Sequence, residues 1–183
     1  MTDLFLVPVG DDWIDRYEET VTSPLSSPDE APAELSYDSS VRVWGTTVGE
    51  DSKKRTKFES MEQGDLVLFL HAGEFIGSGR VGETFDNPEL GEWIWGSPES
   101  RFVYTVTDYQ EMSVPRSEVW DILGYSPNYP LYGFSRISDD ATSKLLQTYN
   151  SIEEAFQDFR ADDSGDEETT STATPDENEK EDT

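Results

Sequence analysis

A tryptophan and a cluster of basic residues occur close together between residues 41 and 81, and their spacing suits a flat, charged ligand. Trp44 stands near the end of a segment with strand character at 41–46. Four cations follow shortly after it, at Lys53, Lys54, Arg55 and Lys57. An indole face stacks on an unstacked nucleobase, and neighbouring cations contact the phosphates beside that base. These residues therefore indicate a nucleobase pocket, with an ordinary small β-barrel as the alternative interpretation.

Two further tryptophans, Trp93 and Trp95, lie in a segment at 86–100 for which the Gly, Pro and Glu content predicts an irregular loop. They would either complete an aromatic cage with Trp44 or simply cover the core. We predict that one of the two faces the cage, and the sequence leaves open which one. Trp13 and Trp120 have helical spacing, so we predict that both are core residues.

The residue types needed for catalysis or for binding a metal ion are scarce. His71 is the single histidine, it lies in a predicted turn, and the chain contains no cysteine. A catalytic triad, a zinc site or a cysteine nucleophile therefore finds no support. The glycines from Gly73 to Gly82 fall within strands and not at a strand-to-helix turn, so they do not form a phosphate-binding loop. We expect a protein that is not an enzyme and that has no cofactor and no metal.

The elements that must position these residues follow from hydrophobic patterning. Alternating or continuous apolar runs predict strands, and caps with helical spacing predict helices. The expected strands are 4–9, 41–46, 65–70, 74–85 and 101–107, and the expected helices are 13–21, 53–61, 115–123, 138–149 and 151–159. A turn at 71–73 joins two strands into a hairpin. We predict an α+β domain over 1–160, with a small β-barrel of five to six strands and peripheral helices.

The chain is strongly acidic, with a formal net charge of −27 from 40 acidic and 13 basic residues. Residues 161–183 contain Asp, Glu, Ser and Thr and no aromatic residue, which predicts a disordered acidic tail. The other acids are spread through the domain, which favours a halophilic origin where salt screens their repulsion. A basic partner or nucleic-acid mimicry is the alternative explanation of this charge. No apolar run is long enough to span a membrane, so we expect a cytoplasmic protein.

The order of several short motifs resembles that of the PUA-like superfamily, in particular its EVE and YTH branches. The similarity covers roughly residues 3 to 158, and its specificity lies in the order of the motifs. The motifs are Phe5-Leu6-Val7-Pro8-Val9, Val43-Trp44-Gly45-Thr46-Thr47, Val67-Leu68-Phe69-Leu70, Phe75-Ile76-Gly77-Ser78-Gly79, Glu92-Trp93-Ile94-Trp95-Gly96, Phe102-Val103-Tyr104 and Gly133-Phe134-Ser135-Arg136-Ile137-Ser138.

The resemblance implies a small β-barrel with a surface pocket for a flipped, modified base. It implies that Trp44 is one wall of the cage and that Trp93 or Trp95 is the second. The backbone around Gly45 and Thr46, together with Ser40, would contact the base edge, and the basic cluster would lie beside the phosphates. YTH domains commonly have serine at the position of Gly45. The region before Trp44 holds Asp38, Ser39 and Ser40 in place of an asparagine, which leaves the recognised modification open.

These observations together predict a binding module that recognises a modified, for example methylated, base in DNA or RNA. Because no cutting machinery is visible, a separate nuclease or other effector protein would act with it in a modification-dependent restriction or RNA-modification system. The alternative is a protein-interaction scaffold with an acidic tail and no base pocket. These two hypotheses differ in whether Trp44 and a second tryptophan face a common open cavity.

Overall fold

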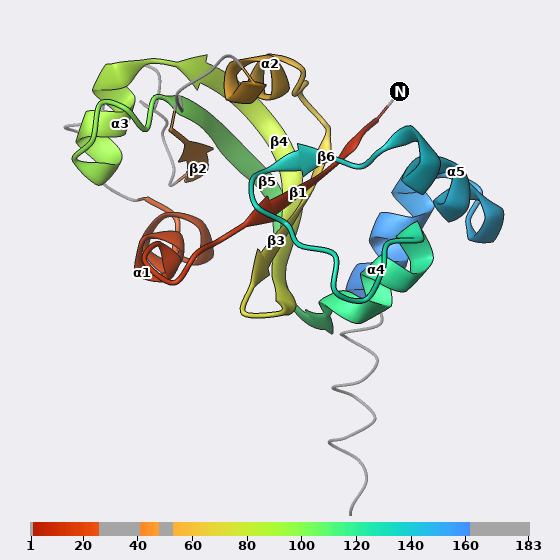
Figure 1. Ribbon diagram of the computed structural model, residues 1–183. Helices are drawn as coiled ribbons and strands as arrows, with labels where there is room; N and C mark the ends of the chain where they lie inside the picture. Colours follow the sequence, from red (N-terminus) through yellow and green to blue (C-terminus); the bar gives the residue numbers. More distant parts are fainter. Residues whose placement is uncertain (1, 26–40, 48–52, 162–183) are drawn as a thin grey trace, which may run out of the picture.

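Six strands form one sheet in the computed structural model, which describes residues 2–25, 41–47 and 53–161 (Figure 1). The strand order is β2-β5-β4-β3-β1-β6. β1 and β3 are parallel, and the other neighbouring pairs are antiparallel. The strands are β1 (Leu4–Pro8), β2 (Arg42–Thr46), β3 (Leu66–His71), β4 (Glu74–Asp86), β5 (Phe102–Pro115) and β6 (Ser135–Arg136).

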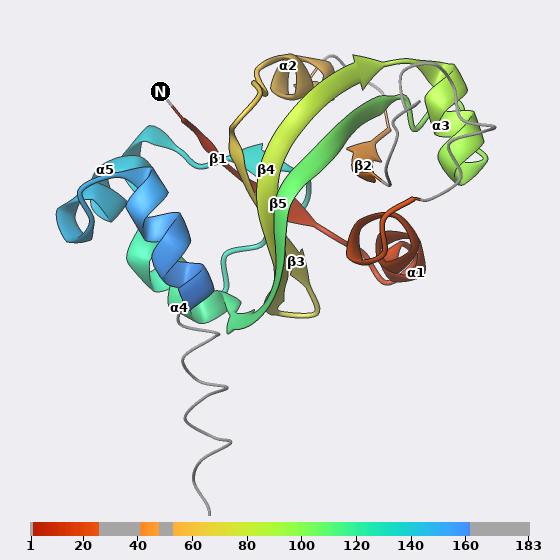
Figure 2. The same cartoon turned by 180° about the vertical axis from the view of Figure 1, so that it is seen from behind.

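The sheet curls because its two long strands are bent. The pairing of β4 with β5 shifts register at three places, and the pairing of β3 with β4 shifts between Phe69 and Leu70. Such bulges increase twist and bend the strands that carry them. The result is an open half-barrel in which β2 and β6 are the two edge strands, as Figures 1 and 2 show.

Helices cover the sheet in two groups. Helix α1 (Ile14–Tyr17), which continues into a π-helix, η1 (Glu18–Thr22), lies near α3 (Pro88–Trp95) on one side (Figures 1 and 2). Helices α4 (Arg116–Leu123) and α5 (Asp139–Thr148) and the helix at 152–161 gather on the other side. Helix α2 (Lys53–Glu59) leads into β3.

Two apolar clusters occupy the two faces of the sheet. Phe5 and Val7 of β1 belong to the cluster that includes Trp44, whereas Leu4 and Leu6 belong to the cluster beneath α4 and α5. Successive side chains of a strand point to opposite faces. β1 and β3 are therefore buried on both faces, which explains their continuous apolar sequences.

The predicted α+β fold is confirmed, with six strands and peripheral helices. The helices expected around 13–21, 53–61, 115–123, 138–149 and 151–159 are all present. The hairpin turn is also confirmed, since Ala72 and Gly73 have φ values of 52° and 85°, which suit a tight turn between antiparallel strands. The division into a domain at 1–160 and a tail stays a prediction, because the described residues end at Ala161 and also exclude 26–40.

The prediction of an irregular loop at 86–100 is wrong, because residues 88–95 form helix α3. The side chain of Asn87 accepts a hydrogen bond of 2.8 Å from the backbone N–H of Glu89, and Pro88 occupies the first turn. Gly96 ends the helix in the left-handed conformation, with φ at 75°. These are ordinary signals for helix ends. The short strand β6 was likewise not predicted.

Candidate functional site

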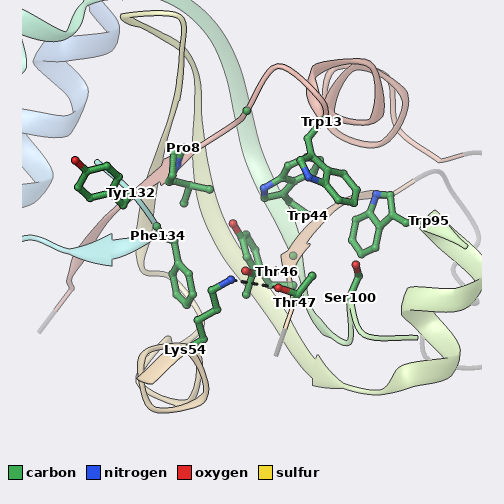
Figure 3. Close-up of a pocket in the computed structure, with 15 residues that line it drawn as sticks. Pro8, Trp13, Trp44, Thr46, Thr47, Lys54, Trp95, Ser100, Tyr132 and Phe134 are labelled. Carbon is green, nitrogen blue, oxygen red and sulfur yellow. Dashed lines mark hydrogen bonds between the residues drawn. The ribbon is translucent and has the colours of Figure 1, made fainter. Parts of the chain in front are cut away.

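A cavity of about 240 Å³ lies where the half-barrel remains open. Val7 and Pro8 at the end of β1 line one side of it, together with Phe134 just before β6. Residues 44–46 of the opposite edge strand, β2, and Thr47 directly after it line the other side. The curl of the sheet thus brings its two edges to the same cavity (Figure 3).

Three tryptophans from three separate segments border this cavity: Trp13, Trp44 and Trp95 (Figure 3). The ring centroids of Trp44 and Trp95 are 6.0 Å apart, and the rings are nearly perpendicular at 84°. Rings in this arrangement form a corner and leave no parallel slot between them. A flat ligand would stack on one indole face and contact the edge of the other.

Trp44 is held by packing as well as by the sheet. It lies opposite Tyr104 in the pairing of β2 with β5. The Tyr17 ring contacts it edge-on, with centroids 5.6 Å apart, and only 6% of Trp44 is exposed. Trp44 therefore belongs to the core and also forms part of the cavity wall.

Helix α3 decides which of the two tryptophans predicted on a loop borders the cavity. Trp95, its last residue, lines the cavity and is 8% exposed. Trp93 lies two residues earlier, which is about 200° around a helix. Trp93 instead packs, partly buried, against the core cluster. The structure thus brings Trp95 to Trp44 and does not bring Trp93 there.

The prediction that Trp13 is a core residue is wrong. Trp13 immediately precedes α1, is 40% exposed and lines the cavity. Its position after the turn-forming residues Gly10-Asp11-Asp12 was the available signal, because a residue at the start of a helix is not bound to the periodicity of its apolar face. The same prediction for Trp120 is confirmed, since Trp120 is fully buried.

The polar side of the cavity is formed by β2 and by one cation. Lys54 is the charged residue among the 15 described residues that line the cavity, and its Nζ donates a hydrogen bond of 3.2 Å to Thr47 Oγ1. Thr46 and Gly45 line the cavity beside them. Because β2 is an edge strand, backbone groups on its outer side lack a sheet partner among the described strands.

Gly45 is required by the packing around it. A Cβ at this position would clash with the backbone oxygen of Phe102 and would lie 3.2 Å from Cη2 of Trp95. The backbone oxygen is held by the pairing of β5 with β2 and cannot easily move. A serine side chain therefore does not fit at this position without a shift of the sheet edge.

Of the predicted phosphate-binding cations, Lys54 alone borders the cavity. Arg55 is engaged elsewhere, because its Nη1 lies 2.7 Å from Asp86 Oδ2 and 3.8 Å from Glu59 Oε2. Arg101 Nε also lies 2.5 Å from Asp86 Oδ1. Although burial acts in the opposite direction, these two guanidinium groups lower the pKa of Asp86.

The remaining predicted site residues lie away from the cavity or outside the described part. Lys53 and Lys57 are exposed on α2. Ser40, the predicted base-edge contact, falls outside the described residues.

Two buried polar atoms on lining residues have no hydrogen-bond partner among the described residues. They are Trp95 Nε1 and the Tyr104 hydroxyl. Burial raises the pKa of Tyr104, so its hydroxyl stays protonated at neutral pH and can donate. An unsatisfied buried group costs about 1–3 kcal/mol. A ligand that reached either atom would recover part of this cost.

Within the described ranges, no group of three or more His, Cys, Asp or Glu side chains is arranged to hold a metal ion. No helix there is long and apolar enough to cross a membrane.

The chain has the fold of an α+β domain with a curled sheet. One solved structure with a similar fold matches over nearly the whole of its own chain. This is the N-terminal domain of Thermococcus gammatolerans McrB bound to m5C DNA. It matches with a TM-score of 0.61 at 16% sequence identity, covering 84% of this chain and 99% of that chain. At this identity the match shows a common fold.

Two further structures match less well. The YTH domain of Zygosaccharomyces rouxii MRB1, in complex with N6-methyladenosine RNA, has a TM-score of 0.48 at 14% identity and covers 80% of this chain and 88% of its own. Human THYN1, in complex with 5-methylcytosine-containing DNA, has a TM-score of 0.42 at 11% identity, with coverages of 80% and 96%. No protein-family model and no curated protein matches the chain.

Proposed function

We propose that the chain is a non-enzymatic reader of a modified nucleobase, which it binds in the cavity after the base has turned out of its strand. The observation that carries this proposal is the convergence of Trp13, Trp44 and Trp95 on one cavity. Its volume of about 240 Å³ is below the 300–1,000 Å³ typical of pockets for drug-sized ligands, which suits a single base. The McrB domain, which shares the fold, is bound to m5C DNA and so supports this reading.

The energetics of such binding are favourable. Turning a base out of its stack costs a few kcal/mol, and each aromatic stack returns about 1–3 kcal/mol. In our proposal the base stacks on the exposed indole of Trp13 and contacts the Trp44–Trp95 corner, and its added alkyl group contacts the apolar wall. The backbone at Gly45 and Thr46 contacts the base edge, and Lys54 contacts a flanking phosphate. Any cleavage of the nucleic acid belongs to a separate effector protein.

The scaffold alternative has one observation in its favour. Both Trp44 and Trp95 are more than nine-tenths buried, as expected if they only complete the core. Trp13 distinguishes the two hypotheses, because at 40% exposure it contributes an open aromatic face to the cavity. A scaffold has no need of that face.

Calorimetric titration of short single-stranded oligonucleotides tests the proposal. Each DNA or RNA carries one modified base, including 5-methylcytosine and N6-methyladenosine, and is paired with its unmodified counterpart. We expect at least one modification to bind about tenfold or more tightly than its counterpart. Trp13→Ala should weaken that binding about five- to 150-fold, the equivalent of losing one stacked base.

The control is Leu146→Ala on α5, which removes an apolar side chain that is 43% exposed and does not line the cavity. It should bind as the wild-type protein does. If the folded wild-type protein binds every modified oligonucleotide and its counterpart equally, or binds none, the base-reader proposal is wrong and the scaffold hypothesis replaces it.

A further inference from the structure

Tyr132 is the most exposed large apolar side chain among the described residues, at 92%, and it lines the same cavity. Its ring extends beyond Pro8, on the side of the cavity opposite Trp13 and Trp95 (Figure 3). Among the described aromatic contacts, none involves the Tyr132 ring, whereas Tyr129 stacks on Tyr125. The ring thus presents a free face beside the cavity.

The segment that carries Tyr132 is anchored on both sides. Before it, the Tyr129 ring stacks on Tyr125 with centroids 4.3 Å apart, and the Tyr129 carbonyl accepts a hydrogen bond of 3.1 Å from Trp120 Nε1. After it, the buried Phe134 stacks on Phe5 with centroids 6.4 Å apart. Both anchors lie within three residues of Tyr132, which restricts the backbone there and lowers the entropic cost of binding against its ring.

The charges near the cavity favour a single strand over a duplex. Duplex binding depends on neutralising several phosphates with Lys and Arg. Lys54 is the cation that lines the cavity among the described residues, while Arg55 and Arg101 both contact Asp86. A single strand can instead be held largely by stacking, which needs few cations. In a duplex, the neighbouring base remains stacked in its helix and is not free to cover an outer aromatic ring.

We propose that Tyr132 stacks on the base next to the modified one and that the ligand is a single-stranded nucleic-acid segment. This inference rests on the proposed function, because it needs the modified base to occupy the cavity. The strand then runs from the cavity past Pro8 to Tyr132. Removing the ring should weaken binding of such a segment about five- to 150-fold, the equivalent of about 1–3 kcal/mol for one stacked base.

The experiment compares three probes that carry the same modified base: a five-nucleotide single strand, the same strand with abasic positions on both sides of the modified base, and its duplex. A 5-methylcytosine DNA set and an N6-methyladenosine RNA set distinguish the two sources of a single strand. Calorimetry measures the affinities of the wild-type protein, Tyr132→Ala and Tyr132→Phe. Because Tyr132 is 92% exposed, neither change should impair folding.

We expect the wild-type protein to prefer the intact single strand to both other probes. Tyr132→Ala should lose that preference over the abasic probe, and Tyr132→Phe should retain it, because phenylalanine keeps the stacking face. If the wild-type protein distinguishes modified from unmodified strands but Tyr132→Ala binds the intact strand equally well, the inference is overturned and the proposed function stands. Tighter binding of the duplex also overturns it. Failure of the wild-type protein to recognise any modified strand overturns both.

Discussion

Trp44 illustrates how one residue serves both the core and the cavity wall. Its ring makes edge contacts with Tyr17 and Trp95 at centroid distances of 5.6 and 6.0 Å. Replacing such a buried side chain with alanine removes its apolar burial and leaves a cavity. We therefore expect Trp44→Ala to lower the free energy of unfolding by about 3–5 kcal/mol. Denaturant unfolding followed by far-UV circular dichroism measures this change.

Trp13→Ala is the matched comparison for that measurement, since Trp13 lines the same cavity but is 40% exposed. Its loss of stability should be well below that of Trp44→Ala. Equal losses would contradict the assignment of separate roles to the two tryptophans. A drop in base affinity on Trp44→Ala alone is therefore weak evidence, because it combines both effects.

At the residue scale, the sequence indicates Trp44 and Lys54 as members of the site, and the structure brings both to the cavity. It could not distinguish Trp95 from Trp93, because the two side chains point to different sides only when residues 88–95 are helical, whereas in an extended segment they would share a face. It also could not indicate that Arg55 is engaged by Asp86, since the two residues meet only when α2 packs near the end of β4.

An ion-pair network joins the helix at 152–161 to β5. Asp108, at a φ of 52°, places its carboxylate 3.1 Å from Arg160 Nη1 and 3.5 Å from Arg80 Nε. Its carbonyl also accepts a hydrogen bond of 2.8 Å from Arg160 Nη2. Arg80 additionally pairs with Glu153 on the same helix. Because Arg160 is buried, its charge depends on this partner.

The same network makes stability depend on pH. Hydrogen bonding to Arg160, assisted by Arg80, lowers the pKa of Asp108 below its ordinary value of 3.8. A carboxyl group with a lowered folded-state pKa stabilises the fold above its unfolded-state pKa. This contribution is lost as the pH falls through the lower folded-state value. We expect Asp108→Asn to be less stable than the wild-type protein at neutral pH and to lose less stability on acidification.

Denaturant unfolding at pH 7 and at several lower values, down to about pH 2, checks this expectation. Asparagine tolerates the left-handed conformation, so the change adds little backbone strain at this position. Burial raises the pKa of Asp65, which has the opposite effect on stability, but Asp65 is present in both proteins and its effect cancels. Asp121→Asn, on an exposed face of α4, is the control. Parallel pH profiles for Asp108→Asn and the wild-type protein would refute the role of this ion pair.

At the element scale, α3 shows why a local signal can be misread. Asn87, Pro88 and Gly96 are sequence signals for helix ends, yet Gly91 inside the segment weakens helix propensity by about 1 kcal/mol relative to alanine. The structure explains this glycine, because a Cβ there would clash with the backbone oxygens of Ser97 and Ser100. Close packing of the helix against the following turn outweighs propensity, and the sequence alone does not reveal that packing.

For the whole molecule, the α+β class and the five longer strands follow from patterning, except for the second half of β5 at 108–115, and the cavity does not follow from it. It forms because the curled sheet brings β2 and the segment before β6 to opposite sides of one opening. That arrangement depends on the strand order and on the register shifts of β4 and β5, which involve residues far apart in the sequence. Patterning predicts which residues form strands, whereas the pairing of distant strands sets the strand order.

The net charge of −27 leads to a prediction about the whole chain. Like charges repel most strongly in the compact state, and salt reduces this repulsion as the Debye length falls from about 10 Å at 0.1 M to about 3 Å at 1 M. We expect the free energy of unfolding to rise as KCl increases over this range, measured by urea denaturation because urea adds no ions.

The double variant Glu99→Lys, Asp121→Lys changes two exposed acids and reduces the net charge, so its stability should depend less on salt. Sucrose is the control cosolute, because it is excluded from the protein surface and strengthens burial but does not screen charge. A difference between the two proteins that appears in KCl and not in sucrose is therefore electrostatic. If the wild-type protein and the double variant respond identically to KCl, surface repulsion does not limit the stability of this fold.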